Sequence, residues 1–191
     1  MSDRGTPERG DALPPGQKKT DDWPVYHDGE IPRVDLDGWR LRAWGQVEQP
    51  VDWTWDAFAA LPRKEIVADL HSLQGWSVVG RRWTGVAARE LLGRVRLGPE
   101  TCFVSVHGYG GYRANLPLSV FASADTLLAV GLDGSPLSPE RGWPLRLVVP
   151  RRYLWKSVKW VRGLEFLNKD WPGTREMAGR TDDPDPWAKK A

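Results

Sequence analysis

The chain has 191 residues, of which 40% are hydrophobic and 27% are charged, and its formal net charge is +2. This length favours one domain with a sizeable core, and the composition excludes a disordered chain. No apolar run approaches the roughly 20 residues of a membrane span, and the small net charge argues against a nucleic-acid-binding protein. The first 16 residues lack an apolar signal core and a twin-arginine pair, and the chain has one cysteine. These features predict a cytoplasmic protein without an internal disulfide.

The predicted elements are mostly short strands. Residues 1–22 are rich in Pro, Gly and charge and are expected to form a flexible leader, followed by one domain over 23–170 and a surface tail over 171–191. Alternation of apolar and polar residues predicts strands over 39–47, 66–72, 101–107, 112–116, 126–132, 145–149 and 158–167. Short helices are expected over 54–61, capped by Thr54, and over 86–92, with a helical turn after Pro117. Many short strands with few helices predict an α+β fold that is mostly sheet.

Positive charge gathers in one part of the chain. Between residues 141 and 163 there is no acidic residue, and the basic ones are Arg141, Arg146, Arg151, Arg152, Lys156, Lys159 and Arg162. Within this stretch, residues 150–160 mix the cations with aromatic side chains and Ser157. Such a set can bind a phosphate or another oxyanion through charge-assisted hydrogen bonds. A strand edge protected by its lysines and a nucleic-acid-binding patch are the alternatives.

Other residues with reactive side chains give weaker signals. Ser72 follows His71, but adjacent residues of a strand point to opposite faces, so His71 is not placed to act as a base for Ser72 in a serine hydrolase. The three histidines, His27, His71 and His107, lack metal-ligand spacing. Cys102 alternates with two valines, which predicts a small buried side chain rather than a reactive thiol. No glycine-rich nucleotide-binding motif opens a convincing helix.

One segment of the sequence resembles a segment that is typical of a known protein family. The segment ADLHSLQGWS at 68–77, followed by RWTGV at 82–86, resembles the metal-binding segment of the sulfite oxidase family of molybdenum enzymes. Further phrases in the same order support the resemblance: PPGQ at 14–17, WPVYH at 23–27, LPR at 61–63, NLPL at 115–118 and PLRLVVP at 144–150. The similarity extends from about residue 14 to residue 187 and is closest to short, single-domain bacterial members. In this family a cysteine thiolate binds the metal at the position of Ser72, so the serine is the main departure.

The resemblance implies an α+β fold of mixed, mostly antiparallel sheets around one molybdopterin, the molybdenum cofactor. It further implies oxygen-atom transfer between a mononuclear molybdenum and a small-molecule substrate, with electrons passed to a partner that the sequence does not identify. It places Ser72 at the metal-ligand position and implies cofactor contacts at Tyr26, His27, His107, Arg141, Arg146, Lys156, Ser157, Val158 and Lys159. Because a serine hydroxyl has a far higher pKa than a thiol, a non-catalytic molybdopterin-binding or interaction protein is the alternative.

Overall fold

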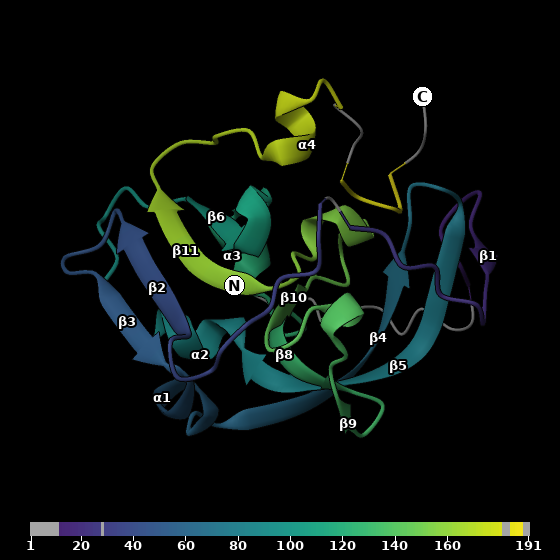
Figure 1. Ribbon diagram of the computed structural model, residues 1–191. Coiled ribbons are helices and arrows are strands. Elements are labelled where there is room, and N and C mark those ends of the chain that lie inside the picture. The colour runs from purple at the N-terminus through teal and green to yellow at the C-terminus, as the bar shows by residue number, and fades with distance from the viewer. Residues whose placement is uncertain (1–11, 28, 181–183, 189–191) are drawn as a thin grey trace.

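Two β-sheets form the scaffold of the protein, of which the computed structural model describes residues 12–27, 29–180 and 184–188. Sheet A consists of β1 (Lys18–Lys19), β4 (Arg63–His71), β5 (Trp76–Ala87), β8 (Leu127–Leu132), β9 (Ser135–Pro136) and β10 (Arg146–Val148). Sheet B has the order β3-β2-β11-β6-β7, with β2 (Arg40–Gly45), β3 (Val51–Thr54), β6 (Phe103–Gly108), β7 (Arg113–Pro117) and β11 (Val161–Leu167). Figure 1 shows sheet B on the left and sheet A on the right and along the bottom.

The helices are short and lie at the ends of strands. They are α1 (Trp55–Ala59), α2 (Ala88–Leu92), α3 (Leu118–Phe121) and α4 (Thr174–Met177), together with the 3-10 turns η1 (Tyr109–Gly111), η2 (Pro139–Arg141) and η3 (Leu154–Lys156). Thr54 caps α1 as predicted, since its hydroxyl oxygen accepts a hydrogen bond from the Ala57 N–H at 3.1 Å. The α+β class is confirmed. Among the described helices, none is long and apolar enough to cross a membrane.

Strand pairing is mostly antiparallel, with two parallel pairs. β11 runs parallel to β2, and β1 runs parallel to β5. The second of these pairs concerns the N-terminal stretch, because the Lys18 N–H donates to the Gly75 carbonyl and the Thr20 N–H donates to the Ser77 carbonyl, both at 2.9 Å. Residues 18–20 therefore belong to the folded domain, and the expectation of a flexible leader does not hold for them.

The structure corrects three further predictions. β5 was not predicted, although it is the longest described strand, and it continues through Val86 and Ala87, which pair with β8. The helix expected over 86–92 therefore begins only at Ala88. Cys102 lies before β6 and is exposed, with its thiol directed to the Asn168 carbonyl at 3.1 Å, so it is not the buried residue that the alternation predicted.

The core has two apolar clusters. The larger one joins the two sheets, since it contains Leu41 and Val104 from sheet B and Leu128 and Leu147 from sheet A, all fully buried. The smaller one includes Leu70 and Trp83 of sheet A and is covered by Trp23 and other apolar side chains. This second cluster places the N-terminal segment against sheet A, next to the site described below.

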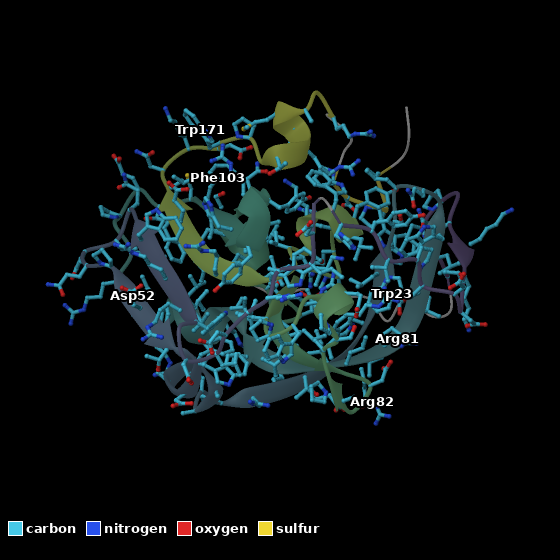
Figure 2. The ribbon with its side chains drawn as sticks, in the orientation of Figure 1. Trp23, Asp52, Arg81, Arg82, Phe103 and Trp171 are labelled. Carbon is cyan, nitrogen blue, oxygen red and sulfur yellow. The ribbon has the colours of Figure 1, made fainter. Side chains whose placement is uncertain are left out.

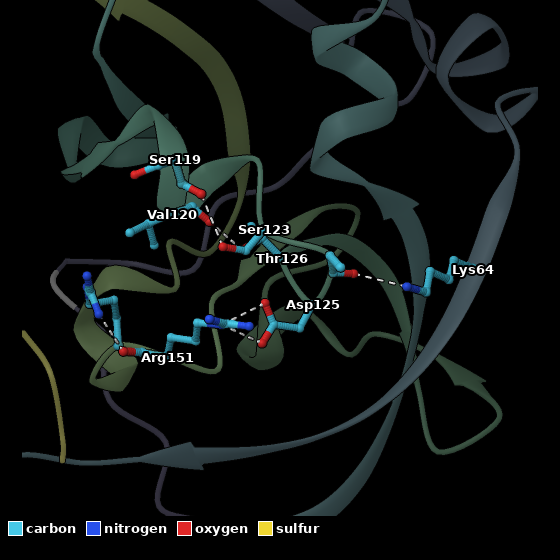
Figure 3. Close-up of polar contacts among 9 residues, drawn as sticks. Lys64, Ser119, Val120, Ser123, Asp125, Thr126 and Arg151 are labelled. Atoms are coloured by element: carbon cyan, nitrogen blue, oxygen red, sulfur yellow. Dashed lines mark hydrogen bonds and ion pairs between the residues drawn. The ribbon is translucent and has the colours of Figure 1, made fainter. Parts of the chain in front are cut away.

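A group of polar residues fixes the connection between α3 and β8 (Figure 3). We call it the Asp125 cluster, and its members are Lys64, Ser123, Asp125, Thr126 and Arg151. The Arg151 guanidinium pairs with the Asp125 carboxylate at 3.0 Å, and the Lys64 ammonium donates to the Ala124 carbonyl at 3.0 Å. The hydroxyls of Thr126 and Ser123 donate to main-chain carbonyls of α3. Both cations of this cluster therefore have partners within the protein.

Beyond β11 the chain forms an arm, residues 168–180, that crosses the top of Figure 1 from β11 to α4. We call it the C-terminal arm. It packs against β7, where the Arg113 N–H donates to the Thr174 hydroxyl at 2.9 Å and the Asn115 side chain donates to the Asp170 carboxylate at 2.5 Å. A Cβ atom on Gly173 would lie 2.8 Å from the Arg113 carbonyl, so this close approach requires a glycine.

Candidate functional site

A cavity of about 540 Å³ is bordered by segments that are far apart in the sequence. Its walls come from residues within 23–27, 72–74, 109–112, 140–146, 154–160 and 175–180. Eight of the ten predicted site residues line it: Tyr26, His27, Ser72, Arg141, Arg146, Ser157, Val158 and Lys159. The fold therefore brings most of the predicted positions together.

Arg146, at the start of β10, is the most deeply buried cation of the cavity. It is 3% exposed, and its two terminal nitrogens donate to the carbonyls of Arg141 at 3.0 Å and Ser157 at 3.2 Å. Its guanidinium carbon lies 5.4 Å from the ring centroid of Trp83. Burial, followed by the nearby charge of Arg141, lowers the pKa of Arg146 to about 9. Such a buried charge is stabilised when an anion enters.

Arg141 and Lys159 add two further positive charges. Arg141 donates to the Trp23 carbonyl at 2.6 Å, and Lys159 donates to the carbonyls of Tyr26 at 2.6 Å and Glu140 at 2.9 Å. Burial, followed by the charges of Arg146 and Arg141, lowers the pKa of Lys159 to about 7. Within the described residues, no carboxylate forms an ion pair with any of these three cations.

Three guanidinium groups lie around the ring of Trp23. The guanidinium carbon of Arg141 lies 3.9 Å from its ring centroid, that of Arg146 lies 5.8 Å away and that of Arg81 lies 6.0 Å away. Figure 2 shows Trp23 and Arg81 close together beside sheet A. Cation–π attraction holds the guanidinium groups in place without neutralising them.

Three residues that line the cavity carry buried N–H donors that have no hydrogen-bond partner among the described residues. These donors are Nε of Arg146, Nε1 of Trp155 and Nε of Arg175. Because an unmade hydrogen bond of a buried donor is expensive, buried donors in native proteins are almost always paired. Unpaired buried donors also occur away from the cavity, at Trp39, Trp83 and Arg81, so they do not by themselves mark a site. Their combination with cations that form no ion pair is what indicates a ligand that is negatively charged and rich in acceptor atoms.

Ser72 lies at the end of β4, where the chain turns into β5. Main-chain hydrogen bonds to Trp76 at 2.8 Å and from Gly75 at 3.1 Å close the turn, and Gly75 has a φ of 85° that favours glycine. The Ser72 hydroxyl accepts a hydrogen bond from the Gln74 N–H at 3.2 Å. Ser72 is 8% exposed and lines the cavity, and its role as a metal ligand stays a prediction.

The ring of His71 does not serve Ser72. Its Nδ1 lies 2.7 Å from the Ser77 hydroxyl, which in turn donates to the side chain of Gln17 at 3.0 Å. This arrangement agrees with the argument against a serine hydrolase. In the part of the chain that the structure describes, no group of three or more His, Cys, Asp and Glu side chains is placed to hold a metal ion.

Two predicted residues do not reach the cavity. His107 pairs with Glu165 at 2.9 Å and borders a second cavity, of about 500 Å³, together with Trp44. Burial is the main cause that lowers the pKa of His107, with help from the charges of Arg113 and Arg162 and against the effect of the Glu165 carboxylate. Lys156 is buried and donates to the side-chain carbonyl of Asn115 and to the Glu176 carboxylate, both at 2.6 Å. The side chain of Lys156 is therefore engaged by β7 and α4, although both neighbouring residues line the cavity.

Sequence reasoning missed several wall residues. Trp155 lies within the basic and aromatic stretch 150–160 and could have been proposed from it. Arg175 and Arg180 line the cavity from the C-terminal arm, which was expected to be a surface tail. No spacing in the sequence points to them, because only the packing of the arm on β7 brings them to the site.

Comparisons with known proteins identify the family of this chain. The family model described as oxidoreductase molybdopterin binding domain matches residues 28–175. The oxidoreductase YuiH of Bacillus subtilis is 38% identical over 176 residues, which cover 92% of this chain and 89% of that protein. The protein-methionine-sulfoxide reductase catalytic subunit MsrP of Xanthomonas axonopodis pv. citri is 31% identical over 71% of this chain. This chain spans about half of that MsrP, namely 47% of its length.

A solved structure supports the fold. The sulfane dehydrogenase SoxCD from Paracoccus pantotrophus matches with a TM-score of 0.69 at 23% identity, covering 78% of this chain and 42% of that one. The resemblance read from the sequence is thereby confirmed at the level of family and fold. This chain belongs to the family of oxidoreductase molybdopterin-binding domains, whose cofactor is molybdopterin.

Proposed function

We propose that the cavity binds molybdopterin and that the chain transfers an oxygen atom between a mononuclear molybdenum centre and a small-molecule substrate. The observation that carries this proposal is the set of unpaired donors on Arg146, Trp155 and Arg175, beside cations without carboxylate partners. Molybdopterin presents a phosphate and a pterin ring with acceptor atoms. Phosphate oxygens favour charged donors, so the residues present fit the group.

The chain's own residues bind and orient the cofactor. Arg141, Arg146 and Lys159 supply positive charge, and Trp23 and Trp160 supply aromatic wall that excludes water. Ser157 lines the same wall, and its hydroxyl accepts a hydrogen bond from the Val149 N–H at 3.0 Å, which fixes the loop before Lys159. When bound, the molybdenum cofactor supplies the exchange of an oxygen atom and two electrons with the substrate.

Metal binding through Ser72 is part of the proposal. A serine oxygen binds a metal most strongly as an alkoxide, and a hydroxyl gives up its proton far less readily than a thiol. The alternative is a non-catalytic molybdopterin-binding protein, and it is favoured by the reluctance of a serine hydroxyl to lose its proton. Both readings require the cofactor in the cavity.

The relatives suggest a substrate class. Proteins named as methionine sulfoxide reductases are 27% to 31% identical to this chain, which supports a sulfoxide as the oxygen donor. Since the chain spans about half of their length, the substrate and the electron partner of the whole proteins are carried over only as proposals. A cytoplasmic location also stays a prediction.

The test is metal and pterin analysis of protein purified from cells that make molybdenum cofactor. We expect about one pterin per chain and its loss in a Lys159→Glu variant, because the carboxylate would repel the phosphate. A Lys64→Glu variant is the matched control, since Lys64 belongs to the Asp125 cluster and does not line the cavity. Pterin with molybdenum supports the enzyme, and pterin without metal supports the alternative. Wild-type protein without pterin would refute both.

A further inference from the structure

The C-terminal arm adds a positive charge to the cavity that no predicted residue supplies. Arg175 lies at the start of α4, with its guanidinium carbon 5.6 Å from the ring centroid of Trp155. Its Nε is buried without a partner, and no described carboxylate forms an ion pair with it. Trp155 also has an unpaired indole N–H. Arg175 and Trp155 therefore offer two unused donors on neighbouring parts of one wall.

An ion pair between the next residues in the chain, Lys156 and Glu176, holds this wall together. Lys156 follows Trp155, Glu176 follows Arg175, and the Lys156 ammonium pairs with the Glu176 carboxylate at 2.6 Å. The Lys156 side chain is 4% exposed, so this ion pair is screened little by water. Removing one partner of such a buried pair would leave the other charge unpaired, so both side chains are needed to keep this contact.

The same ammonium is also tied to the scaffold. It donates to the main-chain carbonyl of Asn115 at 2.8 Å and to the side-chain carbonyl of Asn115 at 2.6 Å. Asn115 belongs to β7 and donates in turn to Asp170 of the arm. Lys156 thus connects η3, β7 and α4, and this connection fixes where Arg175 meets Trp155.

We propose that Arg175 binds an oxyanion in the cavity and that Lys156, acting through Glu176, is the positioning residue that holds Arg175 against Trp155 for this purpose. This inference rests on the proposed function, because it places the oxyanion in the molybdopterin cavity. The oxyanion is either the phosphate of the cofactor or an oxygen-rich anionic substrate. Both have the acceptor atoms and negative charge that the guanidinium and the indole N–H recognise.

The experiment measures binding of inorganic sulfate to cofactor-free protein, with the indole N–H signal of Trp155 in the nuclear magnetic resonance spectrum as the readout. The signal is assigned with a Trp155→Phe variant. We expect sulfate to shift this signal in the wild type, and we expect Arg175→Gln to weaken sulfate binding about tenfold, as for the loss of one charged hydrogen bond. Glu176→Gln should weaken it as well, because Arg175 is no longer held in place.

A double variant separates positioning from general structural support. If Glu176 acts through Arg175, Glu176→Gln has no further effect on sulfate binding once Arg175→Gln is present. Lys156→Met is the corresponding change at the other partner, and circular dichroism shows whether each variant is folded. Glu90→Gln is the matched control, because the Arg94–Glu90 pair is equally short, at 2.6 Å, and joins Glu90 of α2 to Arg94 just beyond this helix, away from the cavity. Unchanged sulfate binding in folded Arg175→Gln, or additive losses in the double variant, would overturn the proposal.

Pterin analysis of the same variants distinguishes the two sources of the oxyanion. Loss of pterin in Arg175→Gln assigns the contact to the phosphate of the cofactor. Retained pterin, with loss of sulfate binding in cofactor-loaded protein, assigns it to a separate anion. A wild type that contains no pterin contradicts the proposed function, whereas the sulfate titration of cofactor-free protein still decides the inference about Arg175.

Discussion

The cations of the cavity and those of the Asp125 cluster are held in opposite ways. In the cluster, Arg151 pairs with a carboxylate at 3.0 Å and both side chains are partly exposed. In the cavity, Arg146 is almost completely buried and donates only to main-chain carbonyls, while its Nε stays unpaired. Arg146 is the more deeply buried charge and has the greater need of a counter-ion, yet no described carboxylate pairs with it.

This contrast separates a structural cation from a ligand-binding one. In a pair such as Arg151–Asp125, the charge of the arginine is already balanced by a carboxylate of the protein, so an anionic ligand has little to gain there. Arg141, Arg146 and Lys159 lie together, and no described carboxylate forms an ion pair with any of them, although the exposed Glu140 borders the same cavity. An anion that enters the cavity therefore supplies charge and hydrogen bonds that the described residues do not. The following predictions test this difference, beginning with the largest effect.

Replacing Arg146 should affect the cofactor far more than replacing Arg151. We expect Arg146→Met to lower molybdopterin retention about tenfold to a hundredfold, because a buried charged donor is lost. Arg151→Met should leave retention unchanged. Pterin released from the purified variants and quantified by its fluorescence gives the measurement. Equal retention in the two variants would remove the basis of the contrast.

Binding of an anion to cofactor-free protein should weaken as the pH rises above about 7, the pKa of Lys159. Burial, followed by the charges of Arg146 and Arg141, lowers this pKa, and the exposed Glu140 raises it. A bound anion would raise it as well. Affinity for sulfate, whose own charge is constant here, should fall by up to about tenfold per pH unit above pH 7, with one proton taken up on binding. Titration calorimetry measures both quantities.

Two variants serve as controls for the pH dependence. Lys159→Met should give weaker sulfate binding with a flatter pH profile, whereas His27→Gln, at the same cavity, should keep the slope. The stability of the cofactor-free protein provides a separate check. Because Lys159 has a lower pKa in the folded state than in the unfolded one, its contribution to stability should rise as the pH increases from about 7 to about 10.

Replacing Ser72 by cysteine should increase the molybdenum content several-fold relative to pterin. A thiolate forms more readily than an alkoxide and is a softer, stronger donor to the metal. The measurement is the ratio of metal to pterin, together with the absorption spectrum of the metal centre. Ser119→Cys adds an exposed thiol on α3 and should change neither. Without any change in the Ser72→Cys protein, the metal-ligand position is assigned to the wrong residue.

The smallest effect is expected in the Asp125 cluster itself. Asp125→Asn should destabilise the protein by only about 0–1 kcal/mol, because the ion pair with Arg151 is partly exposed and screened by water. Urea unfolding monitored by fluorescence measures this change. Added salt should shrink it further, since exposed ion pairs are screened.

Local sequence signals predicted much of the scaffold. Short alternating runs bounded by turn residues gave β2, β6, β7 and β8 to within a few residues, and Thr54 marked the start of α1. β5 escaped because its residues do not alternate cleanly, with Gly80, Arg81 and Arg82 in the middle of the strand. Its long antiparallel pairing with β4 supplies the stability that local propensity does not indicate.

Site residues could be predicted where the resemblance to the family and the basic stretch of the sequence coincide. They could not be predicted where tertiary packing determines which side chain reaches the cavity. Arg141, Arg146 and Lys159 lie in the basic stretch and reach the cavity. Lys156 lies in the same stretch, yet its ammonium is drawn away by Asn115 and Glu176. Neither partner is near Lys156 in the sequence, so only the folded chain reveals their meeting. Arg175 enters the cavity for the same reason.

Trp23 explains how the arginines of the cavity can be held in place and still bind an incoming anion. Its ring lies near the guanidinium groups of Arg81, Arg141 and Arg146. A carboxylate in its place would act as a permanent counter-ion, and every incoming anion would have to compete with it. An indole face attracts cations through its quadrupole and has no net charge, so it holds Arg141 and Arg146 in place and leaves their positive charge available to an incoming anion. Arg81, by contrast, pairs with Asp133 and does not line the cavity. Replacing Trp23 by an acidic residue should therefore weaken anion binding, because the new carboxylate would pair with the arginines in place of the ligand.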